Sequence, residues 1–106
     1  MRRFEVKDTS SAESRPRIDG LTIGQVLAES ARRFPHREAI VFREAAVRMT
    51  YLEFATAVAD AAKGLIALGV KPSEHVGIWA TNISEWVLLQ YTAASIGVIL
   101  VTINPA

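Results

Sequence analysis

The sequence predicts an α/β fold, and three features of the chain indicate it. Short apolar or β-branched runs, too short for helices, occupy residues 76–80 and 98–102. A segment with helix-forming residues lies between them, so residues 76–102 predict a βαβ unit with parallel strands. Because the strands are continuously apolar, we expect a parallel sheet that is covered on both faces. An α/β domain is the class in which such a sheet occurs.

The first part of the chain is polar, and we expect residues 1–20 to form a flexible tail. Arg2 and Arg3 could begin a signal peptide, but no apolar run follows them. Acidic residues at positions 5, 8 and 13 are not typical of a transit peptide. These features predict a cytoplasmic protein.

The first helix is expected to begin at Thr22. Thr22 and Gln25 have the spacing of a capping box, with Leu21 and Val26 at the positions of a hydrophobic staple. Pro35 stops the helix, because proline disfavours a helical conformation in the residue before it. The apolar residues that recur at helical spacing are Ile23, Val26, Leu27, Ala31 and Phe34.

Two short extended segments, residues 39–43 and 46–49, follow the first helix. A polar turn around Glu44 separates them, so they predict a β-hairpin. The Glu44-Ala45 pair lacks the Asn-Gly chemistry that two-residue hairpin turns favour.

A second capping box, Thr50 with Glu53, predicts the start of the next helix, and Met49 and Phe54 form its staple. Gly69 is placed to end this helix in a left-handed conformation. Because the expected buried face is mostly alanine, we expect the helix to pack closely on its neighbours. The residues of this face are Ala55, Val58, Ala59, Ala62, Leu65 and Ile66.

The third helix follows the strand at residues 76–80. Asn82 or Ser84 can cap it, and Glu85 lies in its first turn, where the helix dipole favours an anion. The helix is expected to run to about Ile96 and to end at Gly97.

Composition excludes several kinds of site. The chain has 106 residues, no cysteine, two histidines and a formal net charge of +1. Disulfides and thiolate metal sites are therefore excluded, and two histidines are too few for a histidine-based zinc site unless carboxylates complete it. The small net charge gives no support for a nucleic-acid partner.

No residue of the sequence is expected to be catalytic, cofactor-binding or metal-binding. The residues with potential chemistry are His36, His75, Glu53, Asp60, Trp79 and Trp86. We expect the histidines in exposed turns, the carboxylates on a helix surface and the tryptophans in a core or a domain interface. No glycine-rich phosphate loop follows the strand at 76–80, and no nucleophile, base and orienting group can be grouped from the sequence.

Residues 86–106 carry no charge and must be buried in protein or lipid. A membrane span is disfavoured, because the eighteen uncharged residues 86–103 are at the lower limit of a crossing and polar residues interrupt them. One chain of this size offers too little surface to cover the segment, so we expect an incomplete domain. A small non-enzymatic interaction module and a membrane-associated protein remain as alternatives that would use the same segment.

Five elements in order resemble the adenylate-forming (AMP-binding) acyl-CoA synthetase superfamily. Residues 50–54, Thr-Tyr-Leu-Glu-Phe, are similar to its Thr-Tyr-x-Glu-Leu element. The Leu-Gly-Val at 68–70, the Val-Gly-Ile-Trp-Ala at 76–80 and the Gly…Asn-Pro stretch at 97–105 follow at the family's spacing. The Ala31-x-x-x-Pro35-x-x-x-Ala39 spacing also fits the family's first helix and strand. Residues 79–87 look most like the fatty-acyl-CoA synthetase branch. One departure is Ser-Glu-His-Val at 73–76, where the family often has Gly-Asp-Arg-Val.

The resemblance implies that residues 21–106 are the truncated N-terminal segment of a large layered α/β AMP-binding domain. It implies a parent enzyme that uses ATP, Mg²⁺ and CoA to activate a fatty acid, medium-chain or related, through an acyl-adenylate. The family's phosphate loop, ribose-binding aspartate and C-terminal lysine have no counterpart in residues 1–106. We therefore expect this chain alone to be inactive, and the remainder of the domain to cover its apolar C-terminal half.

Overall fold

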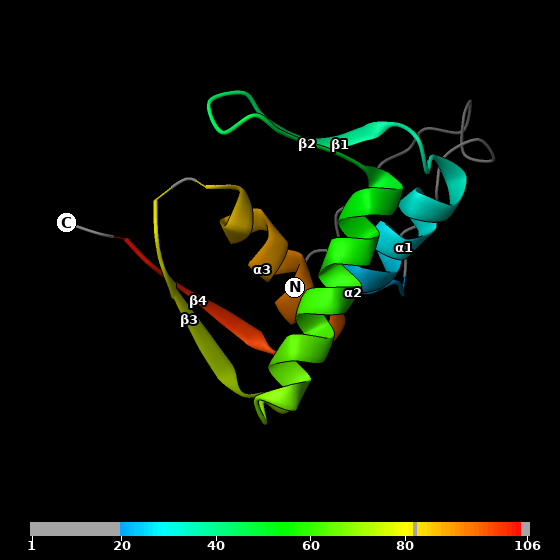
Figure 1. The fold of residues 1–106 in the computed structure, drawn as a ribbon. Coiled ribbons are helices and arrows are strands. Elements are labelled where there is room, and N and C mark those ends of the chain that lie inside the picture. Colours follow the sequence, from blue (N-terminus) through cyan, green and yellow to red (C-terminus); the bar gives the residue numbers. More distant parts are fainter. Residues whose placement is uncertain (1–19, 82, 105–106) are drawn as a thin grey trace, which may run out of the picture.

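The computed structural model describes residues 20–81 and 83–104. This part of the chain contains three helices and four strands arranged in two small sheets (Figure 1). The predicted tail lies, except for Gly20, outside the described residues. The elements in chain order are α1 (Ile23–Arg33), β1 (Glu38–Phe42), β2 (Val47–Thr50), α2 (Tyr51–Ala67), β3 (His75–Trp79), α3 (Ser84–Ser95) and β4 (Ile99–Ile103).

Helix α1 begins as predicted, with Thr22 as its N-cap. The Gln25 N–H donates to Thr22 Oγ1 over 3.1 Å, and the Thr22 N–H donates to Gln25 Oε1 over 2.8 Å. Leu27 and Ala31 are buried, but the rest of the expected apolar face lies near or at the surface, with Ile23 60% exposed. The predicted apolar face of α1 was wider than the buried one, because α2 and α3 pack against only one side of α1 in the described chain.

Helix α2 is capped at both ends as predicted. Thr50 and Glu53 form the capping box. At the other end, Gly69 has φ +91° and its N–H donates to Ile66 O over 3.0 Å. The N–H of Val70 donates to Leu65 O over 3.1 Å, which completes a Schellman motif.

The buried side of α2 is narrower than the predicted one. Phe54, Val58 and Ala62 are buried, whereas Ala59 and Ile66 are exposed. Ala59 and Ile66 were wrongly assigned because the contact between α2 and its neighbours follows one narrow stripe of the helix. The sequence alone does not show on which side of an alanine-rich helix that stripe lies.

The predicted hairpin is confirmed, with each strand one residue from its expected bounds. Strands β1 and β2 pair antiparallel, with Val41 opposite Arg48 and an irregularity between Glu38 and Ile40. In the connecting turn, Ala46 takes φ +53°, a conformation that hairpin turns commonly require but that alanine disfavours.

The core lies where the hairpin meets the three helices. Leu27, Phe54 and Val58 form its buried centre. The ring of Phe54 meets that of Tyr91 edge to face, with centroids 5.5 Å apart. Partly buried residues that surround this centre are Ala39, Ile40, Met49, Tyr51, Val87, Leu88 and Tyr91.

The predicted βαβ unit is also confirmed. Strands β3 and β4 pair in parallel, with His75 opposite Ile99 and Trp79 opposite Ile103. Gly97 follows α3 with φ +72°, as its position predicts. The expected side-chain cap of α3 was wrong for Ser84, since the N-cap is Ile83 and makes no side-chain hydrogen bond. Asn82 lies outside the described residues.

The expected covering of the parallel sheet on both faces is not found among the described residues. Figure 1 shows the β3–β4 pair beside α3, away from α1 and from the β1–β2 hairpin. Only alternate residues of β3 point into the molecule, and four of the five residues of β4 are exposed. Large apolar side chains therefore face outward, with Trp79 74% exposed. Within the described residues, no helix has the length and apolar character that a membrane crossing needs.

Candidate functional site

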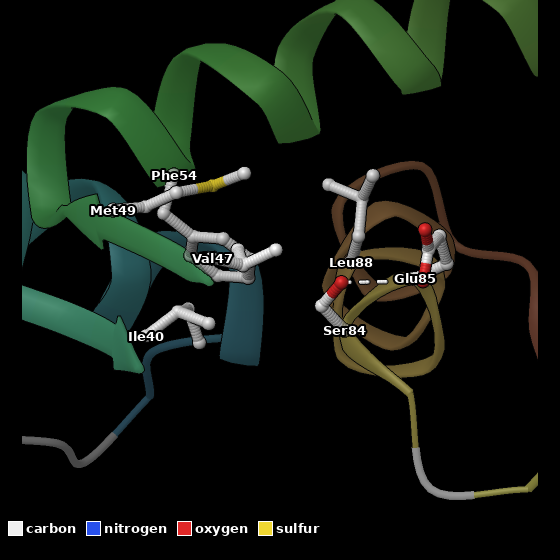
Figure 2. Close-up of a pocket in the computed structure, with 7 residues that line it drawn as sticks. All are labelled: Ile40, Val47, Met49, Phe54, Ser84, Glu85 and Leu88. Atoms are coloured by element: carbon white, nitrogen blue, oxygen red, sulfur yellow. Dashed lines mark hydrogen bonds between the residues drawn. The ribbon is translucent and has the colours of Figure 1, made fainter. Parts of the chain in front are cut away.

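An apolar cleft separates the hairpin from the first turns of α3 (Figure 2). It encloses about 200 Å³, and hydrocarbon side chains and one thioether form most of its wall. The hairpin contributes side chains from both of its strands. Helix α2 contributes Phe54, and α3 contributes residues of its first turn and Leu88. The lining residues are Ile40, Val47, Met49, Phe54, Ser84, Glu85 and Leu88.

Two polar side chains of α3 stand at one side of this cleft. Ser84 Oγ donates a hydrogen bond to Glu85 Oε2 over 3.2 Å (Figure 2). No imidazole lines the cleft, and Glu85 is exposed to solvent. An exposed carboxylate is a weak base, and acyl transfer also needs donors for the oxyanion. The arrangement can accommodate an apolar group, but it does not supply the groups of a nucleophilic catalyst.

A second hollow lies at the start of α1. Leu21, Ile23 and Val26 line it together with Tyr91 of α3, around about 350 Å³ of open space. Among the described residues, its lining contains no charged side chain. This hollow therefore resembles an uncovered part of the core more than a site that recognises a polar ligand.

The carboxylates considered from the sequence have structural roles or face solvent. The Thr50 N–H donates to Glu53 Oε1 over 2.8 Å, and the Glu53 N–H donates to Thr50 Oγ1 over 3.1 Å. The hydrogen bond from the Thr50 backbone, followed by that from its side chain, lowers the pKa of Glu53. Glu53 thus serves as a helix cap, and Asp60 is exposed further along α2.

The two histidines occupy different parts of the molecule. His36 is exposed in the turn between α1 and β1, and His75 is exposed at the first position of β3. Both lie in the exposed positions that the sequence predicts. Across residues 20–81 and 83–104, no three histidine, aspartate or glutamate side chains form a group that could hold a metal ion.

Arginine side chains gather at the end of α1. The guanidinium carbons of Arg33 and Arg37 lie 5.2 and 4.7 Å from the centre of the Phe34 ring. Arg32 Nε donates to Glu29 Oε2 over 3.1 Å, and this hydrogen bond lowers the pKa of Glu29. Cations are favourable at a helix C-terminus and over aromatic faces, so stability accounts for this cluster.

Sequence reasoning did not find the apolar cleft. It assigned Met49 and Phe54 to a helix staple and did not relate them to α3, which follows more than thirty residues later. The alternating apolar residues of the hairpin were a usable signal for one wall. The opposite wall depends on how α3 crosses α2, and no local pattern encodes that crossing.

Comparisons with known proteins assign the chain to one group of enzymes. The sequence model described as "AMP-binding enzyme" matches residues 27–106. The putative acyl-CoA synthetase YngI of Bacillus subtilis is 43% identical over 83 residues, which are 78% of this chain and 15% of that protein. The mitochondrial medium-chain acyl-CoA ligase ACSF2 of Danio rerio is 46% identical over 89 residues, 84% of this chain and 15% of the relative.

Solved structures agree with this assignment. A putative long-chain-fatty-acid CoA ligase from Rhodopseudomonas palustris superimposes with a TM-score of 0.75 at 31% identity, covering 83% of this chain and 22% of that one. A fatty acyl CoA synthetase of Mycobacterium tuberculosis gives a TM-score of 0.75 at 34% identity, and the match covers 78% of this chain and 16% of that one. The chain thus spans a small part of each relative, and the matches do not support an interaction module or a membrane-associated protein.

Proposed function

Because the chain belongs to the AMP-binding enzyme family, we propose that it supplies the N-terminal part of an ATP-dependent acyl-CoA ligase for medium-chain fatty acids. The observation that carries the proposal is the match of residues 27–106 to this family, together with homology to acyl-CoA ligases. The names of the ACSF2 relatives support the medium-chain substrate.

The proposed reaction has two steps. The fatty acid carboxylate attacks the α-phosphate of ATP, which releases pyrophosphate and forms an acyl-adenylate. The CoA thiol then attacks the acyl carbon, forms the thioester and releases AMP. Both steps develop negative charge on oxygen, so they need a cluster of donors and cations, with Mg²⁺ at the phosphates. We assign this cluster, and with it the chemistry, to the rest of the parent enzyme.

The part played by this chain is that of a scaffold. Its outward-facing apolar residues on β3 and β4 support this role, because large exposed apolar surfaces mark places where further protein packs. We propose that the remainder of the ligase domain covers them. The curated relatives are long enough to provide this cover, since the chain spans 15% of YngI.

A chimera tests the proposed function. Residues 21–106 would replace the matching segment of Bacillus subtilis YngI, and ATP–pyrophosphate exchange would be measured with fatty acids of increasing chain length. We expect the chimera to exchange with the same fatty acids as intact YngI, because the segment restores the scaffold that the rest of YngI needs. A soluble, folded chimera without exchange would overturn the proposal. YngI with its own segment re-inserted through the same junctions is the matched control.

The isolated chain should not catalyse the same exchange. We expect the 106-residue chain to incorporate no label from labelled pyrophosphate into ATP with any acid of the panel. Activity of the purified chain above that of a mock preparation would contradict the scaffold role.

The cytoplasm is the proposed location of the protein. The ACSF2 relatives are named as mitochondrial, so the mitochondrion is the location against which the cytoplasm is tested. Fractionation of cells that express the chain with a C-terminal tag should place it with cytosolic markers, and recovery in an organelle would contradict this location.

A further inference from the structure

The helical part and the β3–β4 strand pair differ in how strongly core packing stabilises them. The buried centre of the core, Leu27, Phe54 and Val58, is formed by α1 and α2, and the residues packed around it come from the hairpin, α2 and α3. No residue of β3 or β4 belongs to this cluster. The hydrophobic free energy that holds the helices and hairpin together therefore does not depend on the strand pair.

The strand pair is held to the rest of the described chain by few interactions. Ile78 is buried, as is Val98 just before β4. The Val98 N–H also donates to Ala93 O of α3 over 2.9 Å. Two further hydrogen bonds at the start of the strands, from the Ser73 N–H to Gly97 O and from the Ile99 N–H to Glu74 O, each over 2.8 Å, join the two strand segments to each other and not to the helices. The opposite end of the pair carries the exposed Trp79 and Ile103.

Two-stranded sheets are marginally stable in water, and parallel pairing is slightly weaker than antiparallel pairing. In a pair of strands each member has one edge without a partner, and β4 also exposes Ile99, Val101 and Ile103. Helix α2, in contrast, has a capping box, a Schellman motif and a buried stripe. Local opening of β3–β4 is therefore expected at much lower free energy than opening of α2.

We propose that the chain contains two units of different stability. The first, the stable unit, comprises α1, the hairpin, α2 and α3; the second, the dependent unit, comprises β3 and β4. The dependent unit is the surface on which the rest of the ligase domain assembles, and it becomes fully ordered when a further strand and an apolar layer cover it. Only the identity of that covering layer rests on the proposed function.

Hydrogen exchange of the 106-residue chain, followed by NMR or mass spectrometry at neutral pH, tests the proposal. The hydrogen-bonded amides of β3 and β4 should be less protected than those of α2 by about 100-fold or more. Equal protection of the two sets of amides would overturn the proposal. Absence of protection in α2 would overturn it as well, since the stable unit would then not fold alone.

Two substitutions separate the units. Ile78→Ala should remove the remaining protection of β3 and β4 and leave that of α2 unchanged. Val58→Ala should lower the protection of α2 and change that of the strands little, because they already open separately. If each variant lowered the hydrogen-exchange protection of α2 and of the strands equally, the chain would be one cooperative unit and the proposal would be wrong.

The same amides in the YngI chimera identify the covering layer. Protection of β3 and β4 should rise there toward that of α2. These measurements require no ligase activity, so an inactive chimera with protected strands would count against the proposed function alone. An active chimera with strands as exposed as in the isolated chain would count against the dependent unit alone.

Discussion

Ser73 holds a backbone conformation that serine disfavours. Its φ is +70°, in the left-handed region, while its N–H donates to Gly97 O over 2.8 Å and ties the turn to the start of β4. A side chain in this region costs about 1–2 kcal/mol. The family pattern that residues 73–76 resemble has glycine at this position, so the departure noted in the sequence places backbone strain at this turn.

Ser73→Gly should raise the free energy of unfolding by about 0.5–1 kcal/mol, since relief of strain exceeds the added flexibility of glycine. Urea denaturation of the chain measures the change. Ser30→Gly is the matched control, because Ser30 lies inside α1, where the same replacement should destabilise by about 0.5 kcal/mol. Destabilisation by both variants would show that Ser73 is not strained.

Glu53 makes the stability of α2 depend on pH. Hydrogen bonds from Thr50 lower its pKa below the ordinary value of 4.5, so the folded state favours the carboxylate. This stabilisation is fully present above the pKa of the unfolded chain and is lost as pH falls through the lower folded pKa. Glu53→Gln should therefore be less stable than the parent chain at neutral pH and nearly equal to it in acid.

Thermal unfolding between acid and neutral pH measures this difference. The matched variant is Gln25→Glu, which introduces the same carboxylate into the capping box of α1. We expect it to gain the pH dependence that Glu53→Gln loses. A difference between Glu53→Gln and the parent that stays constant across this pH range would contradict the assignment.

At the scale of elements, α1 and α3 are in close contact at a glycine. A Cβ built on Gly24 would lie 3.0 Å from Ser95 Cα, which is tighter than most contacts that Cβ atoms make, so the backbone of α3 would have to shift by a few tenths of an ångström. Gly64, inside α2, has no atom within 4 Å of the equivalent position. The two helical glycines therefore test packing against intrinsic helix propensity.

Gly64→Ala should stabilise the chain by about 0.5–1 kcal/mol, because alanine favours the helix. Gly24→Ala should destabilise it, since the cost of separating α1 from α3 exceeds the same gain in propensity; overpacking costs about 1–3 kcal/mol. Chemical denaturation of the two variants side by side measures both signs. Stabilisation by Gly24→Ala would show that the helices are not in close contact there.

At the scale of the whole molecule, the two tryptophans report on separate surfaces. Trp79 is 74% exposed at the end of β3, whereas Trp86 is partly buried on α3. With Trp86→Phe, the remaining fluorescence should be strongly quenched by acrylamide and should emit at longer wavelength. With Trp79→Phe, quenching should be weaker. Similar quenching of the two variants would contradict the exposed face of the strand pair.

The sequence determined the elements of this protein, and it did so through interactions between near neighbours. The two capping boxes at Thr22 and Thr50, the left-handed glycines at the helix ends and the parallel βαβ order are all confirmed. Such signals lie within a few residues of each other, so they are visible without a structure. The family was predictable for a similar reason, because its elements recur in order at fixed spacing.

Only the tertiary structure decided which faces are buried. It showed that Ile23 and Ile66 face solvent, that Ser84 is not the N-cap of α3 and that the hairpin and α3 enclose an apolar cleft. It also showed that the outer face of β3–β4 is uncovered in the described chain. These properties depend on how elements far apart in sequence cross one another, because burial is a property of the contact between surfaces and local periodicity shows only which residues are available for it.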